Sequence, residues 1–181
     1  MTVTKNIYYV GVNDRELDLF EGHYIVPEGM AYNSYIIVDE KCAVMDSVDK
    51  KFGEEWLENI AKVLGERSPD YLIVQHMEPD HSANIGKFAE KYPEAVIVSS
   101  QKSFGMMKNF FDNDYADRRI VVGDGDSLSL GSHTLRFAAT PMVHWPEVIM
   151  TYEESEGILF SADAFGKFAT LFAFSSINPI S

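Results

Sequence analysis

The sequence predicts an α/β fold in which helices cover β-sheets. Short apolar runs with the two-residue alternation of strands recur along its 181 residues, and segments with the helical period lie between several of them. Polar residues of the types that bind metals fall where predicted strands end, which is the usual place for a functional site on this kind of fold. Hydrophobic residues make up 46% of the chain, enough for a sizeable core in one domain. We therefore expect residues 1–181 to form a single domain.

Four predicted strands occupy the first part of the chain. Each is a short run rich in β-branched or aromatic residues, and turn residues separate the runs. The third and fourth strands form a hairpin across the polar turn at residues 39–41. Cys42 opens the fourth strand, and we expect it to be a small buried hydrophobe. The four strands span residues 7–12, 17–20, 32–38 and 42–45.

Three predicted helices alternate with the strands that follow. The first has apolar residues at helical spacing from Phe52 to Leu64 and acidic residues on its other face. The second spans residues 82–91, with Ser82 as its N-cap. The third spans residues 103–111, and we expect its Met and Phe side chains to lie in the core.

Seven more short strands complete the prediction. A turn at residues 131–133 joins two of them into a hairpin, and we expect His133 to lie on the surface there. The acidic turn at residues 123–126 lacks the spacing of a calcium-binding loop, so we interpret it as a plain turn. The seven strands span residues 70–74, 95–98, 119–122, 127–130, 134–139, 148–152 and 157–161.

The loop after the strand at residues 70–74 contains four side chains of metal-binding type within six positions: His76, Glu78, Asp80 and His81. Pro79 disfavours helix in the loop and biases the residues before it toward extended backbone. Alternate side chains of an extended segment share a side, so the first three would face one way, and the fourth would be free to face a second metal. Imidazole nitrogens and carboxylate oxygens suit iron, manganese or zinc, and the absence of thiolate argues against a closed structural zinc site. The alternative is a solvated acidic loop with two incidental histidines.

Two more ligand-type residues lie at the ends of predicted strands. His144 lies in the loop after the strand at residues 134–139, and Asp163 follows the last predicted strand. Asp46 and Asp49 end the first hairpin, and we interpret both as turn residues, although their position also lets them support a metal ligand. Four aromatic residues near these motifs are interpreted as core or pocket wall: Trp145, Tyr32, Tyr35 and Phe165.

The charge balance of the chain is strongly acidic. The net charge is -13, which disfavours nucleic acid or an anionic membrane surface as a partner, because both need clustered Lys and Arg. Cys42 is the single cysteine, so no intrachain disulfide forms. The first residues lack the basic and then apolar layout of a signal peptide, and no apolar run reaches membrane-spanning length. These features predict a cytoplasmic protein.

On these motifs the sequence resembles the metallo-β-lactamase superfamily and, within it, the flavodiiron proteins. The superfamily loop is H-x-H-x-D-H, and Glu78 replaces its second histidine, which is the flavodiiron variant. Residues 30–35, 140–146 and 160–166 are similar to further segments of that family, and the resemblance runs from about residue 10 to residue 168. The resemblance implies an αββα sandwich, expected to be incomplete at its C-terminal end.

The resemblance also implies a site and an activity. His76, Glu78 and His144 would hold one iron, Asp80 and His81 the second, and Asp163 would bridge the two. A carboxylate in place of imidazole adds charge and a harder donor, which shifts the preference from zinc toward iron or manganese. The expected activity is reduction of O2 to water or of NO to N2O, with electrons from a rubredoxin or flavoprotein partner.

The sequence departs from the family at its C-terminal end. The family supplies one more histidine ligand from beyond Asp163, which this chain lacks; His23 is a candidate substitute. The segment at residues 169–181 is apolar and does not resemble the family, and no flavodoxin-like domain is recognised, so FMN is expected only in a partner or in a longer relative. We therefore expect a shortened family member, with an exposed apolar surface that favours homo-oligomers.

Two other functions remain open from the sequence. One is a metal-dependent hydrolase, in which Asp80 would orient a metal-bound hydroxide, although Glu78 counts against it. The other is an inactive or O2-sensing module whose second metal is weakly bound because a ligand is missing.

Overall fold

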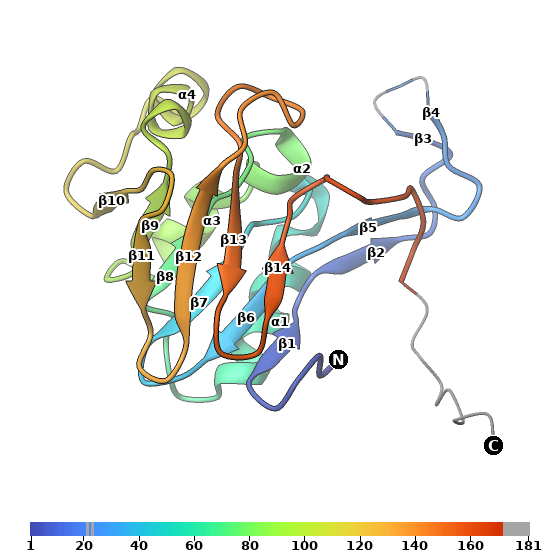
Figure 1. The fold of residues 1–181 in the computed structure, drawn as a ribbon. Helices are drawn as coiled ribbons and strands as arrows, with labels where there is room; N and C mark the ends of the chain where they lie inside the picture. The colour runs from blue at the N-terminus through green and yellow to red at the C-terminus, as the bar shows by residue number, and fades with distance from the viewer. Residues whose placement is uncertain (21, 23, 172–181) are drawn as a thin grey trace.

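Two β-sheets packed face to face form the centre of the fold, and helices cover the outer face of the larger sheet (Figure 1). The computed structural model describes residues 1–20, 22 and 24–171. The larger sheet has six strands in the order β1-β6-β7-β8-β9-β10, and the smaller sheet has four strands in the order β11-β12-β13-β14. The predicted α/β class is confirmed.

The strands of the larger sheet are β1 (Ile7–Tyr9), β6 (Tyr35–Val38), β7 (Cys42–Met45), β8 (Tyr71–Ile73), β9 (Val96–Ser99) and β10 (Arg119–Val121). Those of the smaller sheet are β11 (Ser127–Ser129), β12 (Thr134–Ala139), β13 (Ile149–Glu153) and β14 (Ile158–Phe160). Two short ribbons pair β2 (Val12–Asp14) with β5 (Met30–Tyr32) and β3 (Leu19–Phe20) with β4 (Tyr24–Ile25). The helices are α1 (Gly53–Leu64), α2 (Pro79–Ser82), α3 (Ile85–Lys91) and α4 (Gln101–Phe111), preceded by a 3₁₀ turn at Lys50–Phe52.

Strands β7 to β10 run parallel to one another, and a helical segment connects each to the next. Right-handed crossovers between neighbouring parallel strands place these helices on one face of the sheet. The other face is left for the smaller sheet, which is antiparallel throughout. This topology brings the C-terminal ends of β8 and β9 to one edge of the molecule.

The strands of the larger sheet are apolar on both faces, because each face contributes to a separate core. In β6, Ile36 faces the helices and Ile37 faces the second sheet; in β7, Val44 and Met45 divide in the same way. All four are buried. The two-residue alternation of a strand produces this division, and it explains why these segments read as continuous apolar runs in the sequence.

The helix predictions need three corrections. The helix predicted at residues 82–91 starts only at Ile85, as α3, and a separate short helix, α2, precedes it from Pro79, where a proline suits the first helical position. Ser82 is not an N-cap: it ends α2, and its Oγ lies 2.9 Å and 3.0 Å from the carbonyl oxygens of Met77 and Glu78. In α4, Phe110 and Phe111 are exposed rather than in the core, whereas Phe104 and Met107 are buried as predicted.

The first predicted strand is also divided. β1 ends at Tyr9, and Gly11 leads into β2, which belongs to a separate ribbon. The backbone approaches closely here, because a Cβ on Gly11 would lie 2.2 Å from the carbonyl oxygen of Tyr32. A continuous strand through this point is therefore replaced by a crossing from one sheet to another.

Two further expectations concern single residues. Cys42 is completely buried, as predicted. His133 is not on the surface: it is 3% exposed, and its ring lies between Asp39 and Glu156. The turn that carries it folds back onto the β6–β7 turn, which the local sequence does not reveal.

The outer face of the smaller sheet carries exposed side chains, whereas helices cover the outer face of the larger sheet. Tyr152 and Leu159 are paired neighbours in β13 and β14, and both side chains are exposed on this face. Within residues 1–20, 22 and 24–171, the layers are thus helices, larger sheet and smaller sheet (Figure 1). No helix in this part of the chain is long and apolar enough to cross a membrane.

Candidate metal centre

Six ligand-type side chains meet where strands of the two sheets end. His76 and Glu78 follow β8, while Asp80 and His81 lie on α2. His144 and Asp163 come from the loops after β12 and β14. Their donor atoms form two groups that share Asp163, the first with His76, Glu78 and His144, the second with Asp80 and His81; within each group the atoms lie within 4.8 Å of one another.

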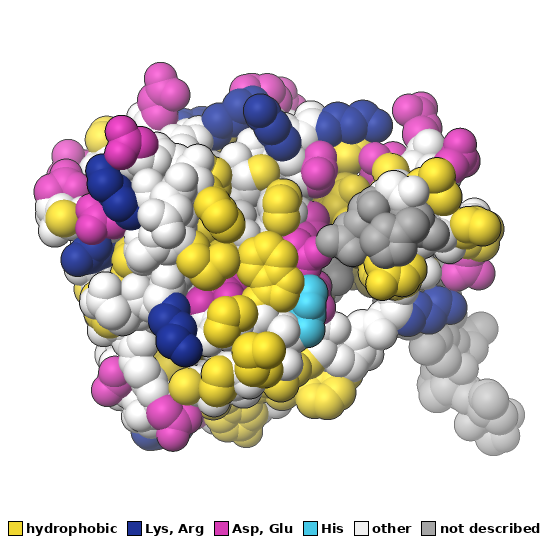
Figure 2. Space-filling model, turned by 90° about the horizontal axis from the view of Figure 1, so that it is seen from above, with side chains coloured by type: hydrophobic (Ala, Val, Ile, Leu, Met, Phe, Trp, Pro, Cys, Tyr) yellow, Lys and Arg dark blue, Asp and Glu magenta, His cyan; other side chains and the backbone are white. Residues whose placement is uncertain are grey.

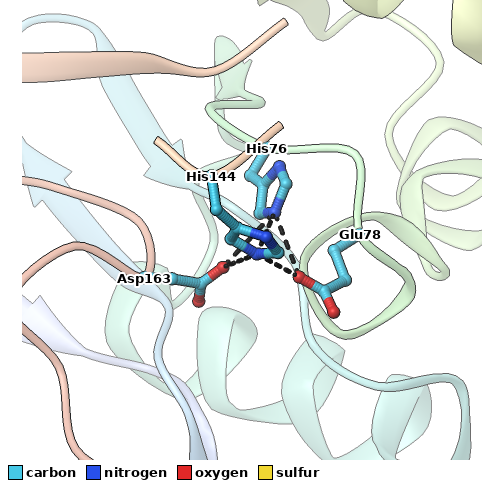
Figure 3. Close-up of side chains that lie close together, drawn as sticks. All are labelled: His76, Glu78, His144 and Asp163. Carbon is cyan, nitrogen blue, oxygen red and sulfur yellow. Dashed lines mark hydrogen bonds and ion pairs between the residues drawn. The ribbon is translucent and has the colours of Figure 1, made fainter. Parts of the chain in front are cut away.

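The first group is gathered around the carboxylate of Glu78 (Figure 3). Its Oε2 lies 3.1 Å from Nε2 of His76 and 2.8 Å from Nε2 of His144, and the two imidazole nitrogens are 3.3 Å apart. Oδ2 of Asp163 is 3.3 Å from Nε2 of His76 and 3.4 Å from Nε2 of His144. Two nitrogens and two oxygens therefore converge on one point.

The second group uses the other oxygen of the shared carboxylate. Oδ1 of Asp163 lies 2.7 Å from Nε2 of His81, and Oδ2 of Asp80 lies 3.8 Å from the same nitrogen. Asp163 thus turns Oδ2 toward the first group and Oδ1 toward the second. This is the arrangement that a carboxylate needs to bridge two cations.

The donor set fits a pair of cations. Three carboxylates and three imidazoles meet at one edge of the molecule, and the buried Oδ1 of Asp80 has no hydrogen-bond partner among the described residues. A buried carboxylate oxygen without a partner is costly unless an ion satisfies it. Mixed nitrogen and oxygen donors without sulfur suit iron or manganese.

The pKa directions show how strongly these groups interact. Burial lowers the pKa of His76, but hydrogen bonds to Asp163, Glu147 and Glu78 outweigh burial and raise the pKa to about 10. Burial raises the pKa of the Asp80 carboxyl to about 6. The centre therefore gathers negative charge that protons balance, and metal cations compete with protons for such ligands.

The local backbone explains which residues separate into the two groups. Glu78 has extended dihedral angles (φ -59°, ψ 144°), so its side chain and that of His76 share a side, as the sequence predicts. Asp80 does not continue this alternation, because the helix has begun at Pro79 and turns Asp80 toward the second group. The start of helix α2 therefore separates Asp80 and His81, in the second group, from His76 and Glu78, in the first.

Sequence reasoning missed Glu147. This residue lies just before β13, is fully buried, and its Oε1 lies 2.8 Å from Nδ1 of His76 and 2.9 Å from the backbone nitrogen of Met77. The available signal was an acidic residue directly before the apolar strand that follows the His144 loop. Nothing in the local sequence marks it as buried.

Asp46 combines the two roles that the sequence left open. It sits in a turn with φ 54°, its Oδ1 accepts the backbone N–H of Gln75 at 2.7 Å, and its Oδ2 lies 3.3 Å from Nδ1 of His81. Asp49 accepts the backbone N–H of Lys51 at 2.9 Å and caps the 3₁₀ turn, so it is a turn residue.

The neighbouring aromatic residues divide between wall and surface. Tyr32 is buried and lines a cavity at the centre, and the ring of Trp145 packs edge-on against His76 with centroids 5.2 Å apart. Tyr35 packs on Phe160. Phe165 is 89% exposed, so it is not in the core, but it lines a cavity, as the other half of its prediction states.

Two expectations fall outside the described residues. His23, the candidate substitute ligand, is one, and most of the apolar C-terminal segment, residues 172–181, is the other. The structure does place the segment just before it: the backbone nitrogen of Leu171 donates to Oδ1 of Asn13 at 2.8 Å.

A cavity of about 370 Å³ opens onto both groups. The side chains of His144 and Asp163 are 54% and 34% exposed, whereas the loop residues of the centre are buried. Aromatic side chains, among them Phe20, Tyr24 and Phe168, line the same cavity as the ligand-type residues. Figure 2 views this edge and shows a histidine between acidic and hydrophobic side chains.

Comparison with known proteins places these features in a wider group. A family model described as ODP family beta lactamase matches residues 30–177. The chain is 34% identical over 171 residues to the nitric oxide reductase of Moorella thermoacetica, a match that covers 92% of this chain and 42% of that protein. It is also 34% identical over 167 residues to the anaerobic nitric oxide reductase flavorubredoxin of Vibrio vulnificus, covering 91% of this chain and 34% of that protein.

Two solved structures have a closely similar fold. The flavodiiron protein from Giardia intestinalis matches with a TM-score of 0.87 at 34% identity, covering 93% of this chain and 41% of that one. Rubredoxin oxygen:oxidoreductase from Desulfovibrio gigas matches with a TM-score of 0.88 at 32% identity, covering 94% of this chain and 42% of that one. The chain therefore spans about two fifths of the length of these relatives, and the fold expected from the sequence resemblance is confirmed.

Proposed function

Because the chain belongs to the ODP family of beta-lactamase-like domains, we propose that its two ligand groups hold two iron ions and that the centre reduces O2 to water or NO to N2O. The observation that carries this proposal is Asp163, whose two oxygens face the two groups. A relative is named nitric oxide reductase and a structural neighbour rubredoxin oxygen:oxidoreductase, which supports redox chemistry of this class.

Each ligand-type residue has a place in the proposed centre. His76, Glu78 and His144 would hold the first iron and Asp80 and His81 the second, with Asp163 shared between them. When bound, a pair of ferrous ions would supply two electrons, enough with two protons to convert two NO to N2O and water; reduction of O2 to water takes four electrons and four protons, so the external donor would supply the other two electrons.

The cavity wall suits a small, weakly polar substrate. Phe20, Tyr24 and Phe168 line the cavity together with the ligand groups, and the ring centroids of the first two lie 5.4 Å and 5.6 Å from that of Phe168. An aromatic wall of this kind limits the water that reaches the centre while O2 or NO passes.

The proposed activity needs an electron donor. Met142 and Phe165 are 70% and 89% exposed, and they lie two residues from His144 and Asp163 respectively. Exposed apolar side chains beside a redox centre suit a protein contact. We propose that the electron donor docks on this surface, and that it is either a rubredoxin or a flavoprotein that carries FMN. A second copy of this chain could dock on the same surface. The cytoplasmic location stays a prediction.

Metal content and rapid kinetics test the proposal. We expect close to two irons per chain after anaerobic reconstitution with Fe(II) and desalting, and oxidation of the reduced centre in stopped flow on mixing with O2 or NO. Fewer than one iron per chain, or irons that do not oxidise with either gas, would contradict it. A matched control is Asp39→Asn, which alters a carboxylate–histidine pair remote from the centre.

The hydrolase alternative receives no support from the geometry. Glu78 occupies the middle of the first group, between His76 and His144, where the hydrolase pattern has a third imidazole. Zinc-dependent turnover of a lactam or thioester that exceeds the gas reduction of the iron form would reverse this assignment.

A further inference from the structure

Both loop histidines present the same nitrogen to the centre and the same nitrogen to a buried carboxylate. Nε2 of His76 and Nε2 of His81 face the two ligand groups. Nδ1 of His76 faces Glu147, and Nδ1 of His81 faces Asp46. A carboxylate at these positions accepts hydrogen bonds, so it keeps the proton on Nδ1 and leaves the Nε2 lone pair for a metal.

Each of these carboxylates also fixes the loop backbone. Oε1 of Glu147 accepts the N–H of Met77 at 2.9 Å, and Oδ1 of Asp46 accepts the N–H of Gln75 at 2.7 Å. The two backbone groups flank His76 in the sequence. Glu147, just before β13, therefore holds the ring of His76 and the main chain next to it, whereas Asp46, after the end of β7, holds the ring of His81 and the main chain on the other side of His76.

The two contacts differ in strength. Glu147 lies 2.8 Å from Nδ1 of His76 with both side chains completely buried, and its Oε2 has no hydrogen-bond partner among the described residues. Asp46 lies 3.3 Å from Nδ1 of His81, and the same oxygen also faces the Gln75 amide at 3.1 Å. Each of these oxygens is shared with a second N–H donor, so the contacts differ in length and burial, and a short contact between completely buried side chains polarises the imidazole more than a longer one.

This inference rests on the proposed metal-binding function. We propose that Glu147 positions His76 to bind the first metal and that Asp46 positions His81 to bind the second. Each holds one histidine in the orientation and tautomer that a metal requires, and each acts on its own metal. The effect of Glu147 is the larger of the two. Neither residue touches the metals or the substrate.

Two variants and a matched control test this proposal on the full chain, with Co(II) as the probe. Glu147→Gln keeps the size of the side chain and removes its charge, and we expect it to weaken one of the two Co(II) sites by about 10- to 100-fold, the usual effect of such a change. Asp46→Asn is expected to weaken the other site, and by less. Glu153→Gln is the control, because Glu153 is equally buried and accepts two backbone N–H bonds in the β13–β14 turn, away from the centre.

The spectroscopic readout separates positioning from general loss of stability. In Co(II)-loaded protein, each Nδ1–H that bonds a carboxylate gives a hyperfine-shifted, slowly exchanging proton signal, and each variant should shift or lose a different one. Affinities for both metals that stay within about twofold of the wild type in Glu147→Gln, as expected for the Glu153→Gln control, would overturn the proposal, and so would affinities for both metals that fall by the same factor.

Two results distinguish a failure of the proposed metal function from a failure of this inference. A wild-type chain that binds no Co(II) would refute the proposed metal function and with it this inference. If Glu147→Gln does not fold, nitrogen NMR of the Zn(II)-loaded wild type decides: we expect protonated, exchange-protected Nδ1 in both His76 and His81. A protonated Nε2 in either ring would overturn the assignment.

Discussion

Asp163 is the residue on which the two halves of the proposed centre depend. Its Oδ2 lies 3.3 Å from His76, in the first group, and its Oδ1 lies 2.7 Å from His81, in the second. Asp80, by contrast, belongs only to the second group. The two aspartates therefore differ in how many metals each would affect.

Substitution of these aspartates should separate a shared ligand from a private one. Asp163→Asn is expected to weaken both metals, because one metal loses its oxygen ligand and the other keeps only a neutral amide oxygen in place of a charged carboxylate. Asp80→Asn should weaken one metal and leave the other close to the wild type. Metal per chain after desalting, with isothermal titration for affinity, measures both; equal losses in the two variants would contradict the shared role.

His133 shows a carboxylate–histidine pair away from the centre, and its pH dependence is predictable. Burial lowers the pKa of His133, but hydrogen bonds to Asp39 and Glu156 outweigh it and raise the pKa above its ordinary value. The pKa of the Asp39 carboxyl is lowered, because its hydrogen bonds to His133 outweigh burial. A raised histidine pKa contributes stability below about pH 6.5 that is lost as the pH rises through the folded-state pKa. A lowered carboxyl pKa contributes stability above about pH 4 that is lost as the pH falls.

The pair should therefore stabilise the fold most between about pH 4 and pH 6.5. His133→Asn is expected to cost about 1–3 kcal/mol near pH 5.5, and less near pH 8.5, because the stability that a raised histidine pKa contributes declines as the pH rises above the unfolded value of about 6.5. Urea unfolding of both proteins at the two pH values measures this. A cost that grows toward high pH would show that the ring is neutral in the fold.

At the scale of elements, Gly11 marks the point where the chain leaves the larger sheet. A Cβ there would lie 2.2 Å from the carbonyl oxygen of Tyr32 and 2.8 Å from the nitrogen of Ser34, and both are backbone atoms. Gly11→Ala is therefore expected to destabilise the fold by about 1–3 kcal/mol. Denaturant midpoints measure the change.

Gly86 provides the matched control for this substitution. It is exposed in α3, and no heavy atom would lie within 4 Å of a new Cβ. Gly86→Ala should stabilise the helix by about 1 kcal/mol, because alanine favours helix over glycine. Equal effects of the two substitutions would mean that the crossing at Gly11 adapts.

The sequence predicts elements well where one local period dominates. The continuous apolar runs of β6 to β9 and the three- and four-residue spacing of α1 predict these elements correctly, because local pattern and burial agree there. The short ribbon strands β4 and β5 were missed or displaced because two or three residues carry too little periodicity. Helix α2 was missed because Pro79 was interpreted as a helix breaker, whereas at the first helical position it is compatible with a helix.

The sequence predicts the ligand-type residues of the candidate centre, but it does not predict the buried residues that contact them. His76, Glu78 and the other ligand-type residues have chemistry that stands out and a spacing that a known loop shares. Glu147 and the buried place of His133 depend on contacts between segments about 70 and 90 residues apart, Glu147 with His76 and Asp39 with His133. No local pattern encodes such contacts.

At the scale of the whole molecule, the proposed centre spans both sheets. The larger sheet supplies His76 and the residues of α2, and the loops of the smaller sheet supply His144 and Asp163. Metal binding should therefore stabilise the packing of one sheet on the other. A ligand at 100 times its dissociation constant stabilises a fold by about 2.7 kcal/mol, so the melting temperature should rise with metal concentration.

This coupling predicts that two similar core substitutions will differ in their effect on metal affinity. Leu135, in β12, lies in the core between the sheets, while Leu57, in α1, lies in the core between helices and sheet; both are buried. Replacing either by alanine should cost about 2–5 kcal/mol of stability. Leu135→Ala should also weaken metal binding more, because β12 leads directly into the loop of His144 and its core sets the distance between the ligands of the two sheets. Co(II) titration of both variants, under conditions where each is folded, measures this, and equal affinities would show that the ligand loops hold their geometry independently of the sheet packing.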